Sequence, residues 1–493
     1  MRSIRVVLAT LAVGFTHVSS AQTAQKIIDD YLRAAGGAKV LRQIQTATLA
    51  GSLTEESTGA TGSYSLVTKE PNRLYLEMIA GPDRFVEAYN GMSAWGQDAG
   101  QGTHTLTGGA ARQAEAAALY WNSRLADVKK ARLAVQLVGK EKSGGRDVYH
   151  VQVSLAAGVT RDVFFDAETH LIAREASPEE SLEIDYAGYR MVNGIQTPQR
   201  LVVRRGGQQY AIAVTRAEFD SPVENSVFDI PRPAATDLPE IKSLILEVAR
   251  NQKAIDEMAK EYTCHVTSEE QKTDSKGRVT STTVSEYESF NLAGDEIRRL
   301  VAKDGKPLSG DQKKKEDERF NREYDKRQNE KAKADADPQK QKRAEEKDQA
   351  QISDFLRAVR FYNVRREQFR GQEVIAVDFG PNPDFKPKKL IDNIIQKLMG
   401  VVWIDEHALD VVRLEGHFSD TAKFAGGVLG SIDKGSSFVF EQARINNEVW
   451  LPSYTEIHMG ARFLVLKARA SEVERYSDYK KFQAESRIVS VKE

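Results

Sequence analysis

The sequence predicts an α+β protein made of two tandem, related domains that are rich in antiparallel strands. The first observation is a repeated segment. Val-Phe-Phe-Asp at 163–166, followed by Arg174, recurs as Val-Trp-Ile-Asp at 402–405, followed by Arg413. Because the order of the flanking segments repeats as well, the repeat predicts two copies of one domain.

The flanking segments of the repeat are the second observation. Each copy is preceded by a similar strand, at 145–151 and 371–377, and followed by a turn that ends in proline, at 193–198 and 447–452. Both copies alternate apolar and polar residues as a sheet with one buried face does. Neither copy carries a catalytic constellation, and this favours binding over chemistry.

The first residues indicate export. Arg2 and Arg5 precede the apolar run 6–15, which is too short to span a bilayer, and Ser19-Ser20-Ala21 offers small residues for cleavage. We therefore expect a signal peptide over residues 1–21 and a mature chain in a bacterial periplasm. The alternative is an interfacial or buried N-terminal helix.

Composition narrows the class of protein further. The chain has 493 residues, a formal net charge of −1 and one cysteine, Cys264. This length allows two or three domains, and a lone cysteine excludes an intramolecular disulfide. Near-zero charge argues against a nucleic-acid partner.

The first domain is expected over residues 22–230. Ile27, Ile28, Tyr31, Leu32 and Ala35 share one helical face that ends at Gly36-Gly37. Strands are predicted at 46–53, 62–68, 74–79 and 83–89, and Asn90-Gly91 predicts a hairpin. A helix is predicted at 110–128, and strands resume at 133 and continue to 219.

A linker over 231–237, rich in proline and alanine, precedes the second domain at 238–493. Asp237 is the expected N-cap of a long helix, after which strands recur at 262–272, 279–290 and 296–302. Residues 352–361 predict a packed helix. A further apolar helix is predicted over 390–399, where core packing is favoured over a mobile lid.

A charged helical insertion is expected over 303–360 of the second domain. Its segment 311–348 is nearly all charged residues, glutamine and alanine, with both signs interspersed. Such a pattern is typical of a solvent-exposed helical arm. The alternative is an arm that binds a protein partner.

The order of helix, strand meander, embedded helices and further antiparallel strands resembles the LolA-type outer-membrane lipoprotein-sorting fold. The residues that carry the resemblance are 69–76, 89–95, 165–174 and 194–198, with 403–413 and 446–452 in the second domain. The resemblance implies two incomplete antiparallel β-barrels with helices on the concave side. It covers most of the mature chain through hairpin and strand signatures.

A curved sheet of this kind keeps an apolar concave face. Transfer of each methylene from water to such a face is favourable by about 0.8 kcal/mol. The expected ligand is therefore a lipid, lipoprotein acyl chains or another extended apolar molecule. Peripheral or transient membrane contact is compatible with this hypothesis. Each candidate residue is also an ordinary core residue in the alternative interpretation. The candidate liners are Leu74, Leu76, Phe85, Trp95 and Trp121 in the first domain and Trp403, Ile404, Phe438 and Phe440 in the second.

The two-domain form departs from the usual single-domain carrier. Two-domain relatives of this fold include a periplasmic regulator that senses mislocalised lipoproteins. A non-enzymatic envelope-sensing or protein-interaction module, contacting an envelope protein through the charged arm, is therefore the alternative function.

An enzyme with an unrecognised site is the second alternative. The histidines are scattered, and the sequence has no HExxH, paired cysteines or GxSxG elbow. Gly426–Ser431 lacks the ending of a phosphate loop and favours a glycine hairpin, and Cys264 is expected to be a buried small hydrophobe. No catalytic residue, metal or cofactor is predicted.

Overall fold

The computed structural model describes residues 17–481 except 101, 129–130, 132, 156–158, 232–237, 274–278, 293–294, 336–357, 388–389, 425–429 and 464–465. The chain divides into two compact units. The first comprises residues 1–91, 96–102 and 112–228, and the second comprises 92–95, 103–111 and 229–493. The predicted cleavage site at Ala21 falls inside the first helix, and the apolar run before it lies outside the described residues.

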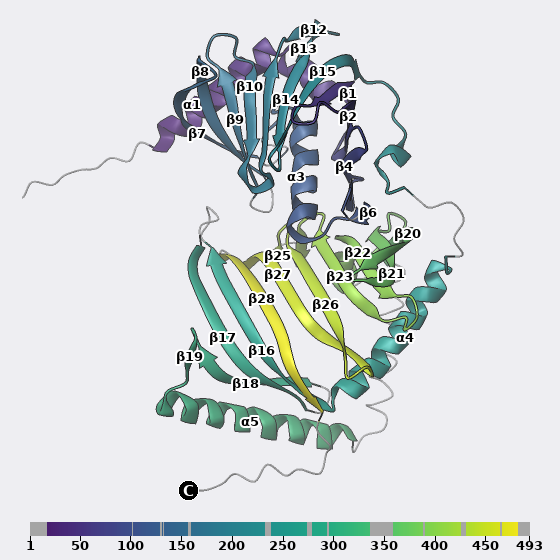
Figure 1. The fold of residues 1–493 in the computed structure, drawn as a ribbon. Coiled ribbons are helices and arrows are strands. Elements are labelled where there is room, and N and C mark those ends of the chain that lie inside the picture. The colour runs from purple at the N-terminus through teal and green to yellow at the C-terminus, as the bar shows by residue number, and fades with distance from the viewer. Residues whose placement is uncertain are drawn as a thin grey trace, which may run out of the picture. The chain divides into compact units, whose positions relative to one another are not determined.

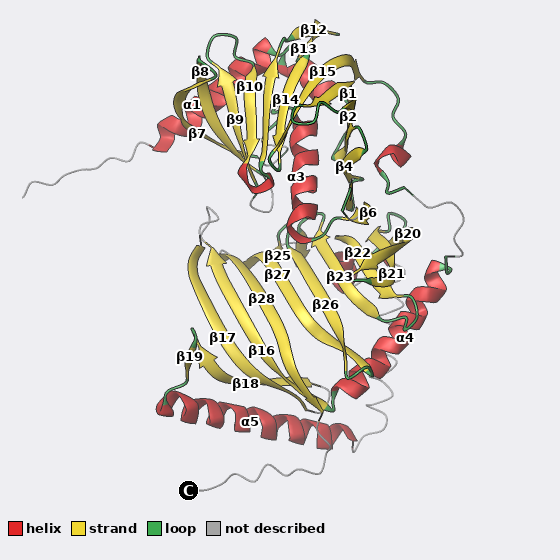
Figure 2. Ribbon diagram, in the orientation of Figure 1, coloured by secondary structure: helices red, strands yellow, loops and turns green. Residues whose placement is uncertain are grey.

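Antiparallel strands dominate both units, as Figures 1 and 2 show. The first part of the chain contains α1 (His17–Ala34), α2 (Ala38–Gln43), β1 (Thr46–Glu55), β2 (Thr61–Lys69), β3 (Arg73–Ala80), β4 (Asp83–Tyr89), β5 (Ala94–Asp98), β6 (Gly102–Thr105), α3 (Gly108–Ser123), β7 (Ala134–Ser143), β8 (Arg146–Ser154), β9 (Thr160–Asp166), β10 (Ile172–Ser177), η2 (Pro178–Glu180), β11 (Leu182–Ala187), β12 (Arg190–Val192), β13 (Ile195–Thr197), β14 (Arg200–Arg205), β15 (Gln208–Phe219) and η3 (Asn225–Phe228).

The second part follows the same plan. It contains α4 (Ile241–Ala259), β16 (Tyr262–Thr273), β17 (Val279–Leu292), β18 (Asp295–Lys303), β19 (Lys306–Pro307), α5 (Gly310–Asp335), β20 (Val359–Phe369), β21 (Gln372–Pro381), α7 (Leu390–Ile395), β22 (Leu398–Asp405), β23 (Val411–Phe418), β24 (Ala422–Phe424), β25 (Gly430–Ile432), β26 (Ser437–Ile445), β27 (Val449–Phe463) and β28 (Leu466–Lys481).

The two sheets share one strand order. The first runs β6-β5-β4-β3-β2-β1-β15-β14-β11-β10-β9-β8-β7, and the second runs β19-β18-β17-β16-β28-β27-β26-β23-β22-β21-β20. In both, the first and last long strands pair in the middle of the sheet, β1 with β15 and β16 with β28. The predicted α+β class with incomplete antiparallel barrels is confirmed, and each sheet stays open.

Helices pack on the concave face of the first sheet, as predicted. Ile28 and Leu32 of α1 belong to one buried cluster with Val151, Val163 and Phe165 of the strands. Their spacing follows the helical repeat, so one face of α1 is buried. The helix ends at Gly36-Gly37, where both φ angles are positive (128° and 101°), as the sequence predicts.

The repeated motif builds the same turn twice. The Asp166 Oδ1 accepts hydrogen bonds from the backbone N–H groups of Glu168 and Thr169, and the Asp405 Oδ1 accepts them from His407 and Ala408. Carboxylates that cap their own turn in this way fix a tight reversal between strands. The repeated Asp therefore sets the β9–β10 and β22–β23 hairpins.

Several predicted boundaries are wrong. Val359 and Phe361, predicted as helix, lie in β20, while 352–357 lie outside the described residues. Leu398 and Met399 begin β22 instead of ending the preceding helix. Short apolar runs do not distinguish a buried strand from a helix, and this ambiguity explains both errors.

The start of the long helix also differs. The N-cap of α4 is Glu240, whose carboxylate accepts from Lys242 N at 3.1 Å and Ser243 N at 2.7 Å. Asp237, the expected cap, lies outside the described residues. The predicted helix at 110–128 ends earlier, at Ser123, because Arg124 and Leu125 adopt positive φ.

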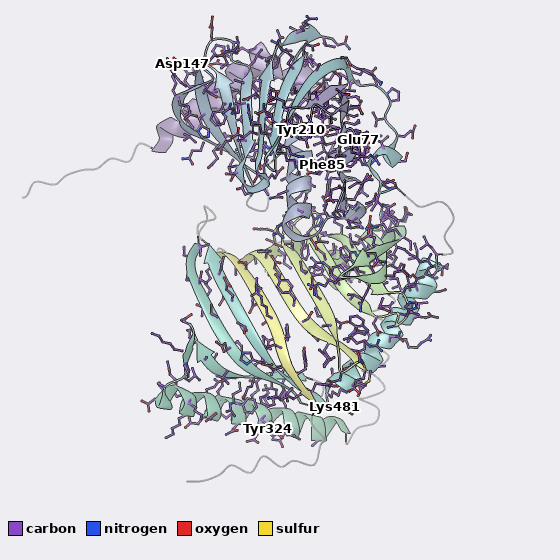
Figure 3. All side chains as sticks on the ribbon, viewed as in Figure 1. Glu77, Phe85, Asp147, Tyr210, Tyr324 and Lys481 are labelled. Atoms are coloured by element: carbon purple, nitrogen blue, oxygen red, sulfur yellow. The ribbon has the colours of Figure 1, made fainter. Side chains whose placement is uncertain are left out.

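Part of the charged insertion packs against the second sheet. Phe320 of α5 lies 5.4 Å from the Phe290 ring of β17 and 6.3 Å from Tyr324, measured between ring centroids. Figure 3 shows Tyr324 on α5. This aromatic contact gives the helix one partly buried side, which the sequence interpretation of a solvent-exposed arm missed. The segment from 336 to 348 lies outside the described residues.

Candidate functional site

A cavity lies between α3 and the concave face of the first sheet. Ala117 and Trp121 are one helical turn apart on α3, so both face the same side. Strand alternation brings Leu66, Leu76 and Ile184 to the opposing wall. Sixteen residues line the cavity: Tyr64, Leu66, Leu74, Leu76, Met78, Glu87, Ala117, Trp121, Arg161, Glu180, Leu182, Ile184, Tyr186, Leu201, Val203 and Arg205.

The lining is mostly apolar. All but Glu87, Arg161, Glu180 and Arg205 are aliphatic, aromatic or methionine side chains. The cavity volume is about 40 Å³. One water molecule needs roughly 10–15 Å³ of such volume, so the cavity holds a few waters. A long ligand therefore requires the walls to move apart.

The charged lining residues form what we call the polar end of the cavity, and Arg161 of β9 is at its centre. The residue is 2% exposed, and its Nη1 donates to Glu175 Oε2 at 3.4 Å. Its Nη2 lies 3.8 Å from Glu180 Oε1, and its guanidinium carbon lies 4.7 Å from the centroid of the Tyr120 ring. The guanidinium is thus held between carboxylates and an aromatic face, where a buried charge needs such partners.

Glu175 is embedded in hydroxyl donors. Tyr120 donates to it at 2.6 Å and Tyr186 at 3.1 Å. Burial raises the pKa of Glu175, although Arg161 and the two hydroxyls oppose the shift. Burial also raises the pKa of Glu180, with Arg161 acting in the opposite direction. The polar end therefore holds two carboxyl groups that take up protons more readily than exposed ones.

A second ion pair lies at the same cavity. The Arg205 Nη2 lies 2.9 Å from Glu87 Oε2, and the Arg205 guanidinium carbon lies 4.2 Å from the centroid of the Phe85 ring. Both charged groups line the cavity. Unlike Arg161, the Arg205 side chain is partly exposed, at 24%.

The structure brings three of the five first-domain candidates together. Leu74, Leu76 and Trp121 line the cavity. Phe85 lies in β4, beneath Arg205 and outside the lining, and Figure 3 marks it in the first unit. Trp95 is buried in β5 but is grouped with the second unit.

The second-domain candidates do not form one group. Trp403 packs with Val374 and Ala376, whereas its neighbour Ile404 packs with Leu244 and Val248 of α4. Adjacent residues of a strand point to opposite faces, so the two cannot line one cavity. Phe438 and Phe440 of β26 lie on the face of Ile404, because β26 pairs them with Gly416 and Leu414, and Leu414 packs in the Ile404 cluster.

Sequence reasoning missed the polar end altogether. Arg161, Glu175 and Arg205 are ordinary charged residues in strands, and nothing local marks them as inward-facing. The available signal was alternation, since Arg161 lies two residues before Val163 and four before Phe165, both buried. A charge in phase with a buried face is a candidate for a functional group.

Two further features of the described part of the chain concern metals and membranes. Within it, no group of three or more His, Cys, Asp and Glu residues is arranged to hold a metal ion. Nor does any helix there have the length and apolar character needed to cross a membrane.

Comparison with known proteins gives structural similarity only. No protein-family model and no curated protein matches the chain. A DUF1329 family protein from Desulfovibrio piger is 14% identical, with 42% of this chain and 97% of that one covered and a TM-score of 0.29. A LolA superfamily protein from Nitrosomonas europaea is 12% identical, with 42% and 96% covered and the same TM-score.

A longer match is the MucA/MucB complex of Pseudomonas aeruginosa, at 10% identity, with 93% of this chain and 99% of that one covered and a TM-score of 0.18. Solved structures described as LolA-like and as lipoprotein-sorting proteins are thus among those similar to this chain. At these TM-scores the overlap says nothing of a ligand or partner.

Proposed function

We propose that this protein is an exported, periplasmic binding or carrier protein for a lipid, lipoprotein acyl chains or another extended apolar ligand. The observation that supports it is the cavity under α3, where twelve of the sixteen lining residues are apolar or aromatic. Each methylene that leaves water for such a wall contributes about 0.8 kcal/mol, so a long chain binds without any reactive group.

Binding a long chain requires the cavity to open. The α3 wall consists of a small residue, Ala117, beside Trp121, and the strand wall includes Met78, whose unbranched side chain adapts to irregular space. Arg124 and Leu125, just after α3, hold φ angles of 47° and 55°. Non-glycine residues in this region are strained, and a shift of the end of α3 would relieve the strain.

The test is native mass spectrometry of the protein purified from the periplasm of a diderm host, followed by lipid extraction. Substituting Ala117→Leu fills the cavity and should abolish a co-purified acyl adduct. Ala213→Leu adds the same atoms to an exposed position of β15 and should leave the adduct intact. Both variants should keep the wild-type circular dichroism spectrum.

Two outcomes would change the proposal. A protein that carries no ligand after purification and binds none of the lipids or acylated peptides offered contradicts the carrier function. A protein partner that binds α5 is then the alternative. N-terminal sequencing of the same sample tests export separately. A mature terminus at Gln22 supports it, and an intact Met1 contradicts it.

A further inference from the structure

The two sheets can be aligned position by position around the repeated motif. Phe164 pairs with Arg174 across β9 and β10, and Trp403 pairs with Arg413 across β22 and β23. One step inward, Val163 pairs with Glu175, while Val402 pairs with Leu414. The buried Glu175 of the first sheet is therefore a leucine in the second.

The next inward position differs even more. Arg161 and Gly400 lie two residues before Val163 and Val402 and are therefore equivalent positions. Gly400 pairs with Gly416, and Ser177, two residues after Glu175, is the equivalent of Gly416. In the second sheet the space above Gly416 is filled by Phe438, whose ring atom lies 2.7 Å from where a Cβ at that glycine would be. The fold therefore closes at this place without charged residues.

Because the fold does not require them, Arg161 and Glu175 need another explanation. Burying a charge costs free energy that apolar residues at the same positions avoid, as the second sheet shows. The presence of an arginine and two carboxyl groups beside an apolar cavity indicates a polar ligand group. Whether the unsatisfied protein group is a hydrogen-bond donor or an acceptor indicates which polar group the ligand carries.

The unsatisfied group at this end is a donor. Within the part of the chain that the structure describes, the buried Arg161 Nε has no hydrogen-bond partner. The carboxylates, by contrast, already have donors. Glu175 receives bonds from Tyr120 and Tyr186, Glu180 from Ser177 at 3.0 Å, and Glu87 from Arg205. What the site lacks is an acceptor.

We propose that this end of the cavity binds the acyl oxygen of an acyl chain, with Arg161 as the donor and the chain lying along Leu76, Ile184 and Val203. The inference rests on the proposed function, since it names the head group of the same ligand. The acyl oxygen belongs either to a free fatty acid or to an acyl ester. A simple alkyl cation has no acceptor and is disfavoured.

The experiment compares three ligands with the same hexadecyl-length chain: hexadecanoic acid, its methyl ester and hexadecylammonium. Dissociation constants are measured for each by competition with a fluorescent fatty acid on the full-length mature protein. The acid or the ester should bind at least about tenfold more tightly than the ammonium compound, the size expected for a hydrogen bond to a charged donor. Tighter binding of the acid identifies a free carboxylate, and equal or tighter binding of the ester identifies an acyl ester.

The variant that tests Arg161 is the double substitution Arg161→Met and Glu175→Leu. The leucine copies Leu414 of the second sheet, and the methionine keeps a long side chain without a charge. Glu180 keeps its hydrogen bond from Ser177. It should keep chain binding and lose the preference for an acyl oxygen. The matched control, Arg174→Gln with Asp185→Asn, removes a pair of 2.6 Å between β10 and β11, on the face of the sheet opposite to Glu175, and should keep the preference.

The outcomes separate the two proposals. Equal binding of all three ligands, tighter binding of the ammonium compound, or a preference that survives in the double variant overturns the role of Arg161 while leaving the carrier function intact. If none of the three ligands binds, the carrier function and this inference fall together.

Discussion

Single residues in the second sheet show how strongly burial decides what an ion pair contributes to the stability of the fold. Arg365 and Asp378 are 3% and 0% exposed, and their side chains meet at 2.8 Å. Glu367 lies 2.5 Å from Arg365 and accepts from the Trp403 indole at 3.1 Å. One arginine therefore pairs with two buried carboxylates.

Substituting Arg365→Met should lower the free energy of unfolding by about 3–5 kcal/mol, because two carboxylates lose their buried cation. Arg366→Met on the adjacent, opposite face is the control. Arg366 pairs with Glu406 at 2.7 Å, with 32% and 22% of the side chains exposed, and should cost about 1 kcal/mol or less. Urea unfolding measures both, and similar losses would contradict the distinction.

Cys264 should react slowly while the protein is folded. Burial raises the pKa of its thiol from 9.0 to about 11, so at pH 8 roughly one hundredth of the usual thiolate is present. Because the folded pKa lies above the unfolded value, this thiol favours folding below pH 9, and that contribution is lost as the pH rises from about 9 to about 11. Alkylation by iodoacetamide with and without urea checks the prediction, and equal rates would contradict it.

Among the elements, α5 has a defined task at the edge of the second sheet. It runs along β18, as Figure 1 shows, and β19 pairs only with Ala302 and Lys303 of that strand. The free backbone of β18 is satisfied by the helix, since Leu300 N–H donates to Glu316 at 2.8 Å and Arg319 donates to Arg298 O at 2.5 Å. An edge covered in this way cannot recruit another strand.

Removing the aromatic anchor with Phe320→Ala should release α5 and expose that edge. The Leu300 amide should then exchange with deuterium faster, by roughly tenfold or more for a loss of about 1.4 kcal/mol or more. Lys326→Ala, at an exposed position of the same helix, is the control. Unchanged exchange at Leu300 would show that the ion pairs alone hold the helix.

The elements also show which features a sequence reveals. The Asp166 and Asp405 turns, the Asn90-Gly91 hairpin and the α1 face were predictable, because each depends on residues close in sequence. The contact of Phe320 with Phe290 was not, since the two are thirty residues apart and the helix otherwise looks fully solvated. The Arg161–Glu175 pair was missed because it needs the register of β9 against β10.

At the scale of the whole molecule, two sheets of one strand order have different interiors. The first has a polar-ended cavity beneath α3, and in the second Phe438 fills the equivalent place above Gly416. Equal topology with unequal filling is expected when side chains, not strand order, decide whether a concave face holds a ligand. The difference also bears on how many ligands one chain carries.

On the proposed function, one chain should therefore bind one acyl ligand, not two. Native mass spectrometry with excess ligand should show a single adduct, which Ala117→Leu removes. Phe438→Leu, which copies Leu182 of the first sheet, makes room in the second and should permit a second adduct if the wall there opens as the first does. Two adducts on the unmodified protein would show that the second sheet binds as well, and the filled place above Gly416 would then have to open without any substitution.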